Sequence, residues 1–211
     1  MKRPNAPLPL KHRIREALSR VGMAMRLDEW AGARAAGLNP TQLAILGLVE
    51  GRGSQGLGVK EIAAHLGVTQ PTATDSIAAL ERKGLIEKQP GMADRRAVRV
   101  VPTAEGRAAL VGAGLEQGLA ERAVGALDTD EQEALLLTLV KMIRHLQETG
   151  GIPIQRMCVT CRHFEPFAHA DAARPHHCTL VDAAIGQREL RIDCRDHIHA
   201  DADSRKILQA G

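Results

Sequence analysis

Residues 59–106, VKEIAAHLGVTQPTATDSIAALERKGLIEKQPGMADRRAVRVVPTAEG, decide the fold of the chain. The stretch opens with a short amphipathic helix over 59–66, which Gly67 ends because glycine adopts the left-handed conformation at little cost. Thr69 follows as an N-cap for a second helix, which continues to the stop signal at Gly84. The sequence therefore predicts two helices joined by a tight turn.

A β-hairpin is predicted directly after these helices. Residues 85–88 and 97–101 have strand-like composition, and the segment 89–96 between them is a turn with a basic tip. Two helices, a tight turn and a hairpin together form a winged helix-turn-helix.

Further helices are expected on both sides of this unit. Upstream, apolar residues recur at helical spacing over residues 11–36, and Asn39 is placed to cap the next helix. The four glycines within residues 51–58 predict a loop. Downstream, Thr103 caps a helix expected to end near Gly125, and Asp128 opens another that ends near Thr149.

The composition agrees with a helical core. Hydrophobic residues make up 44% of the chain and charged residues 25%, which is typical of a globular protein. Only Trp30, Phe164 and Phe167 are aromatic, so the core must be built from aliphatic side chains, which suits packed helices. The predicted fold class is mainly α with a small β-wing, followed by a small cysteine-rich C-terminal module.

The predicted helix-turn-helix indicates a double-stranded DNA partner. The second helix of this motif enters the major groove, and here it begins near Gln70. Short polar side chains near its start are the candidates for contacts to bases or phosphates: Thr69, Gln70, Thr72, Thr74 and Ser76. Arg95 and Arg96 at the wing tip have the charge and reach for phosphates or a narrow minor groove.

The same stretch resembles the MarR family of bacterial regulators, and upstream LNPTQLAILGLV (residues 38–49) fits the resemblance too. The wing sequence Asp94-Arg95-Arg96, followed by Thr103-x-x-Gly106, is its most specific part. The resemblance implies a homodimer that reads a pseudo-palindromic operator, with Asp94 bracing the wing arginine and Arg96 approaching the minor groove.

Four segments follow from this reading. They are an N-terminal arm and dimerisation helix (1–37), the DNA-binding domain (38–106), C-terminal dimerisation helices (107–150) and the cysteine module (151–211).

The four cysteines occur as Cys158-x2-Cys161-x16-Cys178-x15-Cys194, and residues 1–157 contain none. We expect a cytoplasmic protein without a membrane partner, because the N-terminus has no apolar signal region and no stretch approaches the roughly 18 apolar residues of a membrane helix. Thiols are reduced in that compartment, so a metal or cluster site is favoured over disulfides.

Two kinds of metal site fit these cysteines. Complete ligation of an iron–sulfur cluster needs four cysteines, and the spread spacing resembles that of high-potential iron–sulfur proteins, which bind a [4Fe–4S] cluster. Zinc is the alternative, with His197 as a fourth ligand in place of Cys178.

Three functions follow. The favoured one is a DNA-binding transcriptional regulator whose [4Fe–4S] module senses redox state, oxygen or iron. The second is a MarR-type regulator with a structural zinc and a small-molecule effector. The third is an iron–sulfur redox protein, although no enzyme is expected, because no glycine-rich nucleotide motif or spaced Ser/His/Asp set is present.

Overall fold

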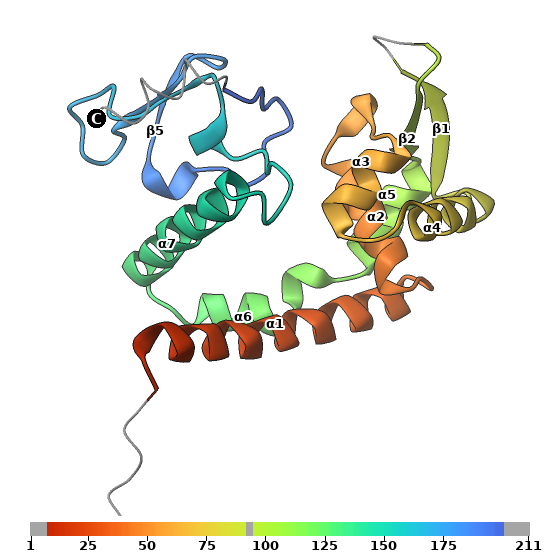
Figure 1. Cartoon of the computed structure of the whole chain (residues 1–211), viewed down its shortest axis with the longest axis horizontal. Helices are drawn as coiled ribbons and strands as arrows, with labels where there is room; N and C mark the ends of the chain where they lie inside the picture. The colour runs from red at the N-terminus through yellow and green to blue at the C-terminus, as the bar shows by residue number, and fades with distance from the viewer. Residues whose placement is uncertain (1–7, 92–94, 201–211) are drawn as a thin grey trace, which may run out of the picture.

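The helix starts follow the capping residues of the sequence, as predicted. A computed structural model describes residues 8–91 and 95–200 (Figure 1). Asn39 Oδ1 accepts from the backbone N–H of Gln42 at 2.8 Å, and Asp128 Oδ1 accepts from that of Glu131 at 2.9 Å. Such caps satisfy backbone donors that have no partner within the helix.

The seven α-helices assigned within the described residues are α1 (Leu10–Ala35), α2 (Pro40–Glu50), α3 (Val59–Leu66), α4 (Gln70–Arg82), α5 (Ala104–Gly112), α6 (Leu119–Gly125) and α7 (Thr129–Glu148). Two strands, β1 (Ile86–Pro90) and β2 (Val98–Pro102), pair antiparallel from Ile86 opposite Pro102 to Pro90 opposite Val98. The fold is thus mainly helical with a small wing, as predicted. None of the described helices is long and apolar enough to cross a membrane.

One aliphatic core holds the winged unit together. It draws buried side chains from α2, the segment 51–58, α3, α4 and both wing strands: Ile45, Leu46, Val49, Leu57, Ile62, Ala63, Ala73, Ile77, Leu80, Ile86 and Val100. Burying such side chains is the main favourable contribution to folding. The helix-turn-helix and the wing therefore form a single packed body.

The glycine-rich segment 51–58 is more than a connecting loop. Leu57 pairs with Val100 of β2, with the N–H of each donating to the carbonyl of the other at 3.1 and 2.8 Å. Gly56 has a φ of +55°, and a Cβ there would lie 2.5 Å from the Val100 oxygen, so only glycine fits. The segment thereby links the end of α2 to the wing.

The sequence predicted one helix from Ala104 to about Gly125, and this predicted length is wrong. It ends at Gly112, and Gly114, with a φ of +62°, turns the chain before α6 begins. Asp28 of α1 caps α6, since its carboxylate accepts from the N–H groups of Leu119 and Ala120 at 2.8 and 2.9 Å. These hydrogen bonds lower the pKa of Asp28, and the one from Ala120 has the larger effect.

Figure 1 shows how the parts are arranged. The long helix α1 lies along one edge with α6 beside it, the winged unit stands at one end, and α7 carries the cysteine module at the other. The chain folds back after α7, where Gly151 N–H donates to the Leu146 oxygen at 2.8 Å. Arg188 of the module pairs with Asp130 at 2.8 Å and also with Glu133, so the module is docked onto α7.

The cysteine module has little regular structure. It contains a three-stranded antiparallel sheet of very short strands, β3 (Phe164–Glu165), β4 (His176–Cys178) and β5 (Ala183–Ile185). Its small core is formed by Cys161, Phe164 and Leu190. The module therefore buries few apolar side chains for its length.

Gly106 explains the Thr-x-x-Gly pattern. Thr103 Oγ1 accepts from Gly106 N–H at 3.1 Å, and a Cβ on Gly106 would lie 2.1 Å from the Leu85 oxygen.

We expect Gly106→Ala to lower the free energy of unfolding by about 1–3 kcal/mol, because the backbone must move to make room for the added Cβ. Gly112→Ala, in the same helix with open space around it, should be neutral or slightly stabilising. Urea unfolding measures both, and equal stability of the two variants would contradict this explanation.

Candidate nucleic-acid interface and cysteine site

One face of α4 is polar and exposed. Ala73, Ile77 and Leu80 point into the core, which turns the opposite face of the helix outward. The predicted contact residues lie on or near that outer face: Thr69, Gln70, Thr72 and Thr74 are exposed, and Ser76 is partly buried. The structure therefore brings the predicted residues of this helix together on one surface.

Some of these hydroxyl groups have local partners. Thr69 caps α4 by accepting from Thr72 N–H at 3.3 Å, and the two threonine hydroxyls lie 2.8 Å apart. The Thr74 hydroxyl donates to the Gln70 oxygen at 2.8 Å. Their main local effect is to fix the start of the helix, and the exposed Gln70 amide is the longest polar side chain there.

Charge on the wing is divided between its base and its tip. Lys88 pairs with Glu81 of α4 at 2.6 Å, and Arg99 pairs with Glu61 of α3. Arg95 and Arg96, nearer the tip, are both exposed. Asp94, expected to brace the wing arginine, lies outside the described residues. The wing thus carries two exposed arginines near its tip.

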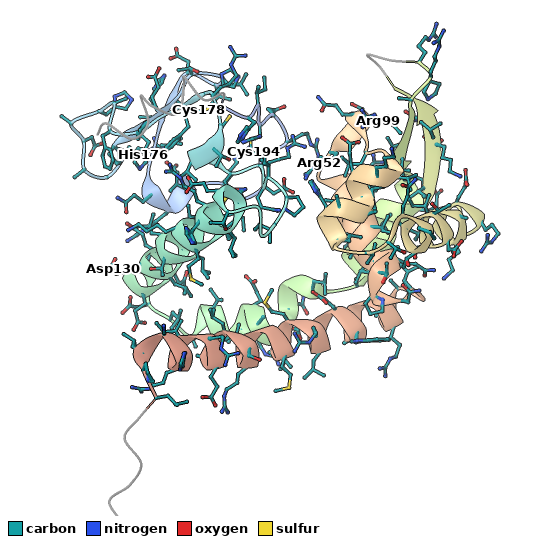
Figure 2. All side chains as sticks on the ribbon, in the orientation of Figure 1. Arg52, Arg99, Asp130, His176, Cys178 and Cys194 are labelled. Carbon is teal, nitrogen blue, oxygen red and sulfur yellow. The ribbon has the colours of Figure 1, made fainter. Side chains whose placement is uncertain are left out.

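The four cysteines span residues 158–194, and the other three lie near enough to Cys158 to influence its thiol. Burial raises the pKa of the Cys158 thiol most, and the nearby Cys194, Cys161 and Cys178 raise it further. The N–H of Arg191 opposes this by donating to Cys158 Sγ at 3.3 Å. All four are free thiols, and Figure 2 shows Cys178 and Cys194 in the same part of the module.

The histidines near the cysteines are engaged by other groups. His176 Nδ1 accepts from Phe167 N–H at 3.2 Å, and its ring lies between Phe164 and Phe167. His197 Nε2 lies 3.1 Å from the Thr160 hydroxyl. Within residues 8–91 and 95–200, no group of three or more His, Cys, Asp or Glu side chains is arranged to hold a metal ion. The assignment of the four cysteines as ligands therefore remains a prediction.

The residues beside Cys194 contact the winged unit, which the sequence did not indicate. Asp193 accepts from Arg52 Nη1 at 2.8 and 3.0 Å, and this arginine side chain is only 6% exposed. Arg195 donates to the Glu50 oxygen at 3.4 Å, at the end of α2. The contact joins residues 141 positions apart, so no local pattern could have revealed it.

Comparison with known proteins agrees with this architecture. Residues 36–97 match the MarR family. A MarR-family regulator from Silicibacter pomeroyi has a similar structure, with a TM-score of 0.56 and 21% identity over 69% of this chain and 96% of its own. CouR from Rhodococcus jostii RHA1, bound to p-coumaroyl-CoA, has a TM-score of 0.52 and 22% identity over 70% and 98%. No curated protein matches the chain.

The fold and the exposed face of α4 define a winged helix-turn-helix protein. More narrowly, the chain carries a MarR-family domain, as the sequence predicted. The family match ends at Ala97 and does not reach the cysteines.

The α4 face and the wing tip predict different effects on DNA binding. Arg96→Ala should weaken binding of operator and unrelated duplexes alike, by about 1–3 kcal/mol, if the side chain contacts the backbone or minor groove. Gln70→Ala should instead reduce the preference for operator over unrelated DNA, because an amide in the major groove contacts base edges. Fluorescence anisotropy at several salt concentrations measures both. Arg174→Ala, an exposed arginine of the cysteine module, is the matched control and should bind like the parent.

Proposed function

We propose that the chain is a DNA-binding transcriptional regulator that acts as a homodimer on a pseudo-palindromic operator and carries a [4Fe–4S] cluster on its four cysteines. The observation that carries the DNA-binding part is the exposed polar face of α4, together with the exposed arginines of the wing. The cluster would report redox state, oxygen or iron supply to the DNA-binding domain.

The homodimer is supported by an unpaired apolar stripe on α1. Ile14, Leu18, Val21 and Met25 recur at helical spacing and are 46, 38, 54 and 49% exposed. A continuous apolar stripe of this kind on a long helix marks an association surface. A two-fold dimer presents two recognition helices, which matches a palindromic site.

The small core of the module supports a bound metal centre. Within residues 151–200, the buried apolar side chains are Met157, Cys161, Phe164, Leu190 and Ala200. A unit of this size with so small a core needs a further cross-link, and neither its thiols nor its short strands supply one. A centre bound by Cys158, Cys161, Cys178 and Cys194 would connect three separate segments.

The spread spacing of the four cysteines in the sequence is the reason for proposing a cluster rather than zinc. Zinc draws four ligands into a tight tetrahedron, with Zn–S distances of about 2.3 Å. A [4Fe–4S] cluster spaces its thiolates more widely, because each one binds a different iron. When bound, such a cluster supplies a centre that exchanges one electron and is sensitive to oxygen.

The two neighbours of Cys194 offer a route from the module to the wing. Asp193 pairs with the buried Arg52, and Arg195 binds the end of α2. Arg52 belongs to the segment 51–58, and Leu57 of the same segment pairs with Val100 of the wing. Any movement of Cys194 therefore acts on the segment that holds the wing, without passing through α7.

The four cysteines should behave as one ligand set. Replacing any one of them by Ala should lower the bound metal of the whole site, because a small site loses affinity when one ligand is removed. Iron, acid-labile sulfide and zinc are measured after anaerobic purification. His197→Ala is the control and should retain full metal content. Zinc without sulfide, lost in His197→Ala and kept in Cys178→Ala, would establish the zinc site instead.

Asp193→Asn should uncouple the module from DNA binding. In the parent, operator affinity should differ between metal-loaded and metal-depleted dimers by about 5- to 150-fold, the usual range of allosteric coupling. The ratio should fall toward one in Asp193→Asn, since the amide no longer balances the Arg52 charge. Asp182→Asn, an exposed carboxylate elsewhere in the module, should keep the parental ratio. An unchanged ratio in Asp193→Asn would exclude this route.

A further inference from the structure

A cavity of about 750 Å³ lies where the winged unit meets the cysteine module. The winged unit contributes residues of segment 51–58, of α3 and of the wing, and the module contributes Ile154, Arg156, His197 and His199. Figure 2 shows Arg52 and Arg99 on the side of the winged unit that faces the module. The cavity is therefore distinct from the α4 face and from the cysteines.

The cavity-lining residues include buried nitrogen atoms that have no hydrogen-bond partner among the described residues. Among them are His65 Nδ1 and Arg156 Nε. His65 Nε2 lies 3.4 Å from Arg52 Nη2, and a guanidinium can only donate, so Nε2 must be the acceptor. The neutral ring then carries its hydrogen on Nδ1, which makes this atom an unpartnered N–H donor.

The neutral form of His65 is also the favoured one. Burial lowers its pKa most, and the charge of Arg52 lowers it further. An unsatisfied buried donor is unfavourable, so both this N–H and that of Arg156 call for an acceptor from outside the protein.

The charges around the cavity specify the kind of acceptor. Arg99 is paired with Glu61, and Arg52 is paired with Asp193. For Arg156, by contrast, the described residues include no carboxylate within ion-pair distance. Arg52 and Arg156 both line the cavity, so an anion bound there would lie beside two guanidinium groups.

We propose that this cavity binds a small organic anion, whose carboxylate or phosphate oxygens accept hydrogen bonds from Arg156 and His65. Leu57 and Ile154 line the same cavity and provide apolar contact for the rest of the molecule. Because the cavity walls come from both units, the bound anion joins the module to the wing. The inference goes beyond the proposed function and does not depend on which metal the cysteines bind.

The test uses isothermal titration of the full-length protein with three probes: inorganic phosphate, hexanoate and hexyl phosphate. At matched ionic strength in chloride, we expect hexanoate or hexyl phosphate to bind more tightly than inorganic phosphate, and their order identifies the preferred head group. Arg156→Gln should weaken the better probe by about tenfold or more, the equivalent of one lost charged hydrogen bond. Arg174→Gln, an arginine of the same module outside the cavity, should bind like the parent.

His65→Phe provides a second variant if Arg156→Gln does not fold, since it removes the donor and keeps a ring in place. Absence of binding for all three probes, or parental affinity in both cavity variants, would overturn the proposal. Metal content and operator affinity are measured on the same samples. A loss of anion binding with both of these unchanged separates this site from the metal and DNA sites.

Discussion

The ion pair between Arg52 and Asp193 is the interaction on which the relation between the two halves of the chain depends. Arg52 is buried at the end of α2, and a buried guanidinium is stable only with a partner that balances its charge. The partner among the described residues is Asp193 of the cysteine module. The DNA-binding domain therefore keeps one of its charges in balance only while the module stays in place.

This dependence gives the module a position that its sequence alone does not suggest. The pair of glycines at 150–151 resembles a flexible linker, which would allow the module to move independently. In the structure Gly151 closes a turn onto Leu146, and Arg188 fastens the module to α7. The module thus has two attachments, one to α7 and one to the winged unit.

Local chemistry made most of the fold predictable. Helix starts at Asn39, Thr69, Thr103 and Asp128 depend on a side chain that caps a backbone group three residues away, so the pattern is complete within a short window. The exposed face of α4 could also be predicted from a short window, because burial of every third or fourth residue sets which side of a helix is exposed. The cysteines were found because they are rare and clustered.

What escaped prediction depends on residues distant in sequence. The break after Gly112 is stabilised by Asp28, which caps α6 from 91 positions away. The anion cavity needs His65 and Arg156 together, and neither belongs to a recognisable motif. Pairings of this kind are set by how the helices pack, and a single sequence carries no record of them.

The contact between Gly106 and the Leu85 carbonyl has a further consequence for movement. It places the start of α5 directly against the backbone that follows α4. No side chain separates the two backbones at this point. Interlocked backbones resist sliding, so α4 cannot shift along its own axis relative to α5. The helices α4 and α5 should therefore move together as one rigid body.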